Sequence, residues 1–237
     1  MLHYGDPLTI HMPPADWTSR GVSAADAVSL ITSGMRVFAH GAAATPTPLL
    51  AALAQRTDLE EVRLYHMHTE GAAPWTEPGI AERIRSVALF CGPSLREPVA
   101  DGRADFVPVF LSDIPSLFQN GIVPLDVAIV QLSPPDRHGF CSLGTSVDCA
   151  RAAVDTARFV IAEINERMPR THGNTAIPFE RIDAFVASDR PLLGRLGYDV
   201  EVALARLGRE HAGRLRGEHQ IALALRLPAD DPELAVA

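Results

Sequence analysis

The chain has 237 residues, 47% of them hydrophobic, which is enough to bury a core in one large domain or two small ones. Its net charge of -8 disfavours nucleic acid as a partner, and because no window approaches ~18 consecutive apolar residues, we expect no membrane span. Its three cysteines lack CxxC spacing and no basic region precedes an apolar run at the amino terminus, so we expect a soluble, cytoplasmic protein.

The chain contains no lysine, so arginine supplies all of its strong cationic side chains. Schiff-base catalysis by this chain is therefore excluded, and so is a phosphate-binding loop that depends on lysine. The sequence also has no glycine-rich run of the GxGxxG type. Chemistry that depends on nicotinamide cofactors or nucleoside triphosphates is accordingly disfavoured.

In chain order, the pattern alternates helices and strands. Ser23 is placed to cap a helix over 24–32, which Gly34 ends, and a strand follows over 35–39. The pattern then predicts helices over 46–56, 77–85, 94–101, 112–119 and about 146–156, and strands over 62–66, 86–90, 106–110, 125–132, 159–163 and 182–186. Repeated βα units of this length predict the α/β class, with a mostly parallel open sheet flanked by helices.

The character of the chain changes near its end. From residue 193 onward, glycines interrupt a stretch rich in Arg, Leu and Ala. We therefore expect an α/β domain over 1–192 and an atypical, weakly ordered tail over 193–237.

The segment from Leu125 to Asp148 carries the strongest functional signal. A short apolar run typical of a strand buried on both faces ends in Gln131 and Ser133, and two prolines then fix the backbone as extended. Gly139 and Gly144 bracket a short loop and permit close approach of the backbone to a ligand. Because ligands bind at the carboxyl ends of strands in open α/β sheets, we expect this segment to form a site wall.

The same segment, with the motif SPPD-xHG-xCSLG, resembles the acetyl-CoA hydrolase/transferase family, class I coenzyme A transferases that include acetate and 4-hydroxybutyrate CoA-transferases. Four further motifs match in order, so that the resemblance spans about 22–192. They are HGAAATPTP from His40, FCGPSLR from Phe90, AEIN from Ala162 and MPRTHG from Met168. The resemblance implies a Rossmann-like CoA-transferase domain.

The resemblance also implies a function. Family members are about twice as long, and a glutamate in their second half attacks the thioester before CoA is passed to an acceptor carboxylate. No motif like that second half occurs here, so the chain resembles an amino-terminal half with no catalytic residue of its own. We expect an acyl-CoA thioester and a carboxylate as substrates, no permanently bound cofactor, and a complementary carboxy-terminal domain or a second copy as partner. A thioester hydrolase and a noncatalytic fragment that binds acyl-CoA or a protein partner are the alternatives. The surface facing such a partner is expected to be apolar and exposed.

The candidate binding residues follow the predicted strands or precede a predicted helix. They are Gly41, Ala42, Ala43, Thr45, Ser94, Gln131, Ser133, Gly139, Ser142 and Gly144. Small side chains after a buried strand leave room for a thioester, but the same residues also suit a packing turn. Ser94 suits a hydroxyl donor to a carboxylate and equally a helix cap, and Ser142 and Gly144 suit a structural turn.

Other polar residues are weaker candidates. His66 and His68 alternate at a strand end, but no third ligand has the spacing of a zinc site, so we expect no metal. Cys141 lacks the glycine pattern of a nucleophile elbow and is better explained by packing. Arg170 and His172 suit contact with CoA phosphates or with a partner domain. The counterpart of Glu163 in the family is not the attacking glutamate, and Asp136 is expected to stiffen its turn.

Overall fold

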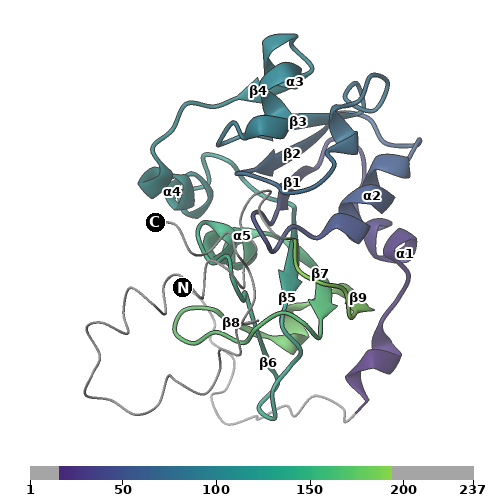
Figure 1. Cartoon of the computed structure of the whole chain (residues 1–237), viewed down its shortest axis with the longest axis vertical. Coiled ribbons are helices and arrows are strands. Elements are labelled where there is room, and N and C mark those ends of the chain that lie inside the picture. The colour runs from purple at the N-terminus through teal and green to yellow at the C-terminus, as the bar shows by residue number, and fades with distance from the viewer. Residues whose placement is uncertain (1–15, 194–237) are drawn as a thin grey trace, which may run out of the picture. The chain divides into compact units, whose positions relative to one another are not determined.

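The computed structural model describes residues 16–193, whose centre is a seven-stranded parallel sheet (Figure 1). Its strand order is β4-β3-β2-β1-β5-β7-β9. These strands are β1 (Arg36–Ala39), β2 (Val62–His66), β3 (Ile84–Ala88), β4 (Ala104–Phe106), β5 (Val127–Leu132), β7 (Phe159–Asn165) and β9 (Ala184–Ser188). All six side chains of β5 are buried, as expected for a central strand covered on both faces.

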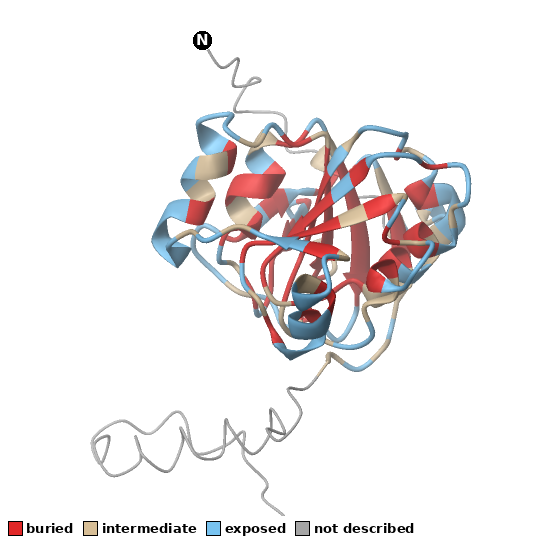
Figure 2. Cartoon of the chain, turned by 90° about the horizontal axis from the view of Figure 1, so that it is seen from above, coloured by how far each residue is buried: buried red, intermediate tan, exposed pale blue. Residues whose placement is uncertain are grey.

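Helices cover both faces of the sheet. Between residues 16 and 193, the five α-helices are α1 (Ala24–Val28), α2 (Thr47–Gln55), α3 (Arg96–Ala100), α4 (Ile114–Gln119) and α5 (Ala150–Thr156). The α1–α2 pair packs on one apolar cluster of the sheet and the α4–α5 pair on the other. Figure 2 shows the buried residues concentrated in the strands and in the inner faces of these helices. No helix within the described residues is long and apolar enough to cross a membrane.

The strand order reverses direction at the middle of the sheet. After β1, the chain adds β2, β3 and β4 toward one edge, and then returns to place β5 on the other side of β1. Strands β7 and β9 extend the sheet in that second direction. The carboxyl ends of β1 and β5 therefore meet at a topological switch point, which is where open α/β sheets bind ligands.

A separate two-stranded antiparallel sheet projects beyond the end of β5. Its strands are β6 (Phe140–Ser142) and β8 (Ala176–Pro178). Ser133 continues the path of β5 and donates its backbone N–H to the carbonyl of Ser142 at 2.9 Å. The stretch between Gly139 and Gly144 was expected to be a loop, and this pairing with a segment far along the chain makes it a strand.

The α/β prediction is confirmed, and β2 has the expected bounds. Two predicted elements are wrong. The segment predicted as a helix over 77–85 instead forms turns that lead into β3, which begins at Ile84. Gly79 takes a left-handed φ of 81°, which ends helical geometry. The strand predicted over 106–110 ends at Phe106, and Pro108 lacks the N–H needed to continue pairing.

The remaining bounds shift by a few residues at one or both ends. Short 3-10 turns precede or flank several elements; they are Trp17–Arg20, Pro93–Leu95, Leu111–Asp113 and Phe179–Arg181. The prediction for the tail over 193–237 concerns residues that, apart from residue 193, lie outside the described range.

Candidate functional site at the carboxyl edge of the sheet

The loop after β1 lies tightly against the loop after β2. A Cβ added at Gly41 would stand 2.6 Å from the backbone oxygen of His68, so this approach requires glycine. Ala42 has a left-handed φ of 51° and donates its N–H to the same His68 oxygen at 2.7 Å. A non-glycine residue in this conformation is uncommon and is found in strained loops at functional sites.

The side chain of Thr45 fixes the far end of this loop. Its hydroxyl donates to the carbonyl of Ala42 at 2.7 Å and accepts the backbone N–H of Glu70 at 3.0 Å. Within residues 16–193, the backbone amides of Gly41 and Ala43 donate no hydrogen bond. Thr45 thus fixes this loop, while two of its amides have no hydrogen-bond partner in the described residues.

Thr69 was not among the expected site residues. It forms a β-bridge with Ala42, and its side chain is buried with no hydrogen-bond partner for its hydroxyl in the described chain. A buried hydroxyl without a partner is costly, so it points to a ligand group that completes the hydrogen bond. In the sequence, the feature that could have identified Thr69 as a site residue is its position shortly after the strand β2.

His40 joins the loop after β1 to the segment after Gly144. Its ring is fully buried, with Nδ1 accepting the backbone N–H of Gln131 at 3.2 Å and Nε2 bonded to the carbonyl of Ser146. Burial lowers the pKa of His40, although the charge of Asp148 and the backbone hydrogen bonds oppose this shift. The ring is therefore neutral at neutral pH and serves as a fixed bridge between the two loops.

Glu163 on β7 is the centre of a buried polar network. Arg190 donates to both oxygens of its carboxylate, at 2.6 and 2.8 Å, and Ser188 donates a third hydrogen bond at 2.7 Å. Arg190 also reaches the carbonyl of Thr45 at 2.8 Å. Because both carboxylate oxygens are occupied, the structure assigns Glu163 a positioning role for the loop after β1.

Gln131 extends this network to the centre of the sheet. Its side-chain amide donates to the carbonyl of Thr45 at 3.3 Å and to Glu163 at 3.4 Å, and its oxygen accepts from Asn165 at 3.2 Å. Thr45 and Gln131, both expected at the site, are therefore brought together. Their polar atoms are used to hold the site in place.

Ser133 and Ser142 form a buried hydroxyl pair at the base of the β6–β8 hairpin. Their Oγ atoms are 3.0 Å apart, and the Ser142 hydroxyl also accepts the N–H of Thr171 at 3.2 Å. Gly144 has a φ of 63°, and a Cβ there would lie 2.0 Å from the sulfur of Met168. Gly139 lies at the outer turn, where its carbonyl accepts from Phe179 at 2.8 Å. These four residues pack and orient the hairpin.

Ser94 lies in the loop that follows β3, inside the 3-10 turn Pro93–Leu95. It is exposed and makes no capping bond to α3, whose first helical residue is preceded by Leu95. The loop as a whole neighbours the site, because Phe90 stacks edge-on against His68 at 5.7 Å between ring centroids.

The weaker candidates have structural partners. His66 bonds to the carbonyl of Met67 and to Ser86, and burial lowers its pKa to about 4. Burial raises the pKa of Cys141 to about 12, so this thiol is not a thiolate at neutral pH. Across residues 16–193, no three His, Cys, Asp or Glu side chains gather as a metal site would require.

The turn after β5 is stiffened by Asp136. One oxygen of this carboxylate accepts the N–H groups of His138 and Phe140, at 2.8 and 3.0 Å. Burial by itself raises the pKa of Asp136, but these hydrogen bonds and the charge of Arg170 bring it below its ordinary value. Arg170 closes the turn by donating to the carbonyls of Pro134 and Phe140. Arg170 is thereby engaged within its own domain.

Similarity to known proteins agrees with this architecture. Residues 11–193 match the model of the acetyl-CoA hydrolase/transferase N-terminal domain. A succinyl-CoA:acetate/propanoyl-CoA:succinate CoA transferase of Fasciola hepatica is 40% identical over 74% of this chain and 36% of its own length. A 4-hydroxybutyrate coenzyme A transferase of Clostridium kluyveri is 41% identical over 77% of this chain and 44% of its own length. The chain thus spans less than half the length of these relatives.

Solved structures give the same result. RipA from Yersinia pestis superposes with a TM-score of 0.70 at 29% identity, over 75% of this chain and 44% of RipA. A 4-hydroxybutyrate CoA-transferase from Porphyromonas gingivalis gives a TM-score of 0.63 at 30% identity, over 76% of this chain and 42% of its own. The chain belongs to the acetyl-CoA hydrolase/transferase family and carries that family's amino-terminal domain.

Proposed function

We propose that this chain is the amino-terminal half of an acyl-CoA:carboxylate CoA-transferase, with acetate as the default acceptor. The relatives that support this proposal are CoA transferases of acetate, propanoate, succinate and hydroxybutyrate. Transfer is favoured over hydrolysis because both of these relatives bear the names of transferases.

The observation that carries the proposal is the loop after β1 at the topological switch point. Its residues Gly41 to Ala43 have small side chains and two amides that donate no hydrogen bond within the described residues. Amides held rigidly in this way suit a thioester carbonyl oxygen, which becomes more negative during attack at its carbon. The hydroxyl of Thr69, beside Ala42, is a third donor for the same group.

The nucleophile of this proposed reaction comes from a complementary second half. Glu163 is the acidic residue buried at the carboxyl edge, but Arg190 and Ser188 occupy its oxygens, and displacing them would break the loop's support. A carboxylate from another polypeptide segment would meet the thioester at the loop after β1. The partner is therefore a carboxy-terminal CoA-transferase domain or a second protein that supplies it.

The test is thioester exchange between labelled acetate and acetyl-CoA. The chain alone is expected to show no exchange, whereas the chain mixed with the carboxy-terminal half of a relative is expected to show it. Thr69→Val keeps the side-chain shape but removes the hydroxyl, and it should lower exchange by about tenfold, the loss expected for one hydrogen bond to a developing charge. Thr32→Val, an exposed position far from the site, is the matched control.

Other results of the exchange assay would distinguish the alternative functions. Exchange by the chain alone would refute the assignment of the nucleophile to a second half. Release of acetate from acetyl-CoA without exchange would identify a hydrolase. Binding of acetyl-CoA without turnover, even with a second half supplied, would identify a noncatalytic module.

A further inference from the structure

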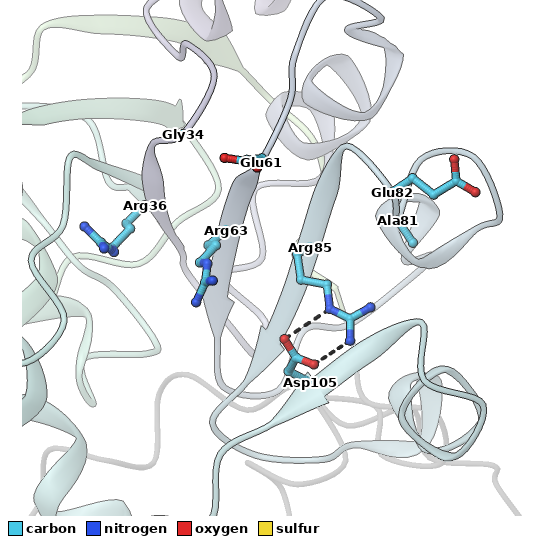
Figure 3. A pocket seen from close by; sticks show the side chains of 8 residues that line it. All are labelled: Gly34, Arg36, Glu61, Arg63, Ala81, Glu82, Arg85 and Asp105. Atoms are coloured by element: carbon cyan, nitrogen blue, oxygen red, sulfur yellow. Dashed lines mark hydrogen bonds and ion pairs between the residues drawn. The ribbon is translucent and has the colours of Figure 1, made fainter.

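A pocket lies at the opposite end of the strands from the carboxyl-edge site. It has a volume of about 630 Å³, within the range of small-molecule sites. Figure 3 shows its lining, which consists of Gly34, Arg36, Glu61, Arg63, Ala81, Glu82, Arg85 and Asp105. The pocket therefore combines the amino ends of β1, β2 and β3 with the turn that leads into β3.

Three arginines form a ladder across this pocket. Arg36 on β1 pairs in register with Arg63 on β2, which in turn pairs in register with Arg85 on β3. Residues in register on parallel strands project from the same face, and neighbouring strands are only about 4.8 Å apart. Like charges placed side by side in this way destabilise a sheet unless an anion separates them.

The structure neutralises one of the three arginines. Arg85 forks onto both carboxylate oxygens of Asp105, as the dashed lines in Figure 3 show. In the described part of the chain, the guanidinium groups of Arg36 and Arg63 form no hydrogen bond or ion pair. Asp126, the residue just before β5, uses one oxygen to accept the backbone N–H of Arg36 at 2.8 Å.

The two glutamates of the pocket do not neutralise the charges of Arg36 and Arg63 by forming ion pairs with them. Neither Glu61 nor Glu82 forms an ion pair with another described residue, and Figure 3 shows the Glu82 carboxylate turned away from the arginines. The eight lining residues include three arginines and three carboxylates, so the positive charge is confined to the row of arginines and the pocket as a whole has no formal net charge. The whole chain carries a net charge of -8. General attraction of anions to this protein is thus weak, and the ladder is a local feature.

We propose that this pocket binds a small anion with two adjacent charged groups, phosphates or carboxylates, held between Arg36 and Arg63. The planar guanidinium fork matches the oxygens of both groups, and two forks on neighbouring strands match two groups in one molecule. Arg85 positions the ladder through Asp105. The hydrogen bond from Arg85 and, to a smaller extent, the charge of Arg63 lower the pKa of Asp105. In the described residues, the guanidinium donors of Arg36 and Arg63 form no hydrogen bond and can bind a ligand. The site is separate from the proposed thioester site and does not depend on it.

Calorimetric titration of the full chain tests this proposal, with inorganic pyrophosphate in one arm and succinate in the other. Arg36→Gln combined with Arg63→Gln is expected to weaken binding at least tenfold, about 1.4 kcal/mol, because both charged contacts are lost. Arg158→Gln is the control, since Arg158, just before β7, is exposed and stacks on Phe159 outside the pocket. Circular dichroism before and after heating checks that each variant is folded.

The two arms of the titration show which kind of anionic group the pocket binds. Binding of pyrophosphate alone assigns the pocket to phosphate groups, and binding of succinate alone assigns it to carboxylates. Arg63→Lys should retain part of the affinity, because it keeps the charge but loses the fork. Absence of binding in both arms would overturn the proposal, and so would an equal loss of affinity in the control and in the double variant.

Discussion

The ring of His66 lies in the core between two hydrogen-bond partners, and burial lowers its pKa to about 4. In the unfolded chain the same group has a pKa of about 6.5. As the pH falls, the unfolded state therefore takes up the proton first, and stability is lost between about pH 6.5 and about pH 4. His40, whose pKa is also lowered by burial, adds to this sensitivity in the same direction.

We predict that His66 contributes about 2 kcal/mol to the loss of unfolding free energy between about pH 7.5 and about pH 5. His66→Asn should shrink that loss, because the side chain no longer titrates. Urea denaturation at the two pH values measures the effect. The matched control is His172→Asn, at an exposed loop position. An unchanged pH dependence in His66→Asn would show that the ring is not kept neutral by the fold.

At the scale of elements, the link between β7, the end of β9 and the loop after β1 depends on one buried ion pair. Glu163 is fully buried and Arg190 is 21% exposed. Removing the arginine leaves a buried carboxylate without its counter-ion, which costs about 3–5 kcal/mol. We therefore expect Arg190→Gln to destabilise the chain by that amount in urea denaturation.

A second substitution tests whether the charge is the cause. Glu163→Gln together with Arg190→Gln removes both charges and should recover part of the loss, which a double-mutant cycle measures. Arg167→Gln breaks the pair with Asp189, in which both side chains are more than half exposed, and should cost less than about 1 kcal/mol. Equal costs for Arg190→Gln and Arg167→Gln would contradict the role of the network.

The position of several candidate residues at the carboxyl edge could be predicted from the sequence, but the contacts of their side chains could not. The strand-then-small-loop pattern placed Gly41, Thr45 and Gln131 at the end of predicted strands, and the structure brings Thr45 and Gln131 into one network. The same pattern gave no sign that Gly144 accommodates Met168. That contact joins residues on two different loops, and local sequence carries no information about such a pairing.

At the scale of the whole molecule, an apolar patch is open to solvent beyond β4. Phe106, Pro108, Val109 and Phe110 line a pocket of about 370 Å³, and Phe110 is 80% exposed. Leu111, in the following 3-10 turn, is 56% exposed. Exposed apolar groups that gather in this way are typical of surfaces that bind another protein, here the proposed second half or a second copy.

We predict that this patch binds a hydrophobic dye and promotes self-association. Phe110→Ser combined with Leu111→Ser should lower dye fluorescence and the concentration-dependent mass in light scattering, without loss of unfolding free energy beyond about 0.5 kcal/mol. Val22→Ser, at another exposed apolar residue, is the control. Equal dye binding by the double variant and the unaltered chain would show that the patch is not the responsive surface.

The sequence by itself determined the class of fold and the edge at which we propose the site, because strands buried on both faces have continuous apolar runs that end in polar or small residues. Only the tertiary structure decided that β1 lies beside β5, that Arg190 supports Thr45 across 145 positions, and that three arginines stand in register. Strand order and register depend on which apolar faces pack together across long separations. Residues next to one another in the chain do not encode that choice.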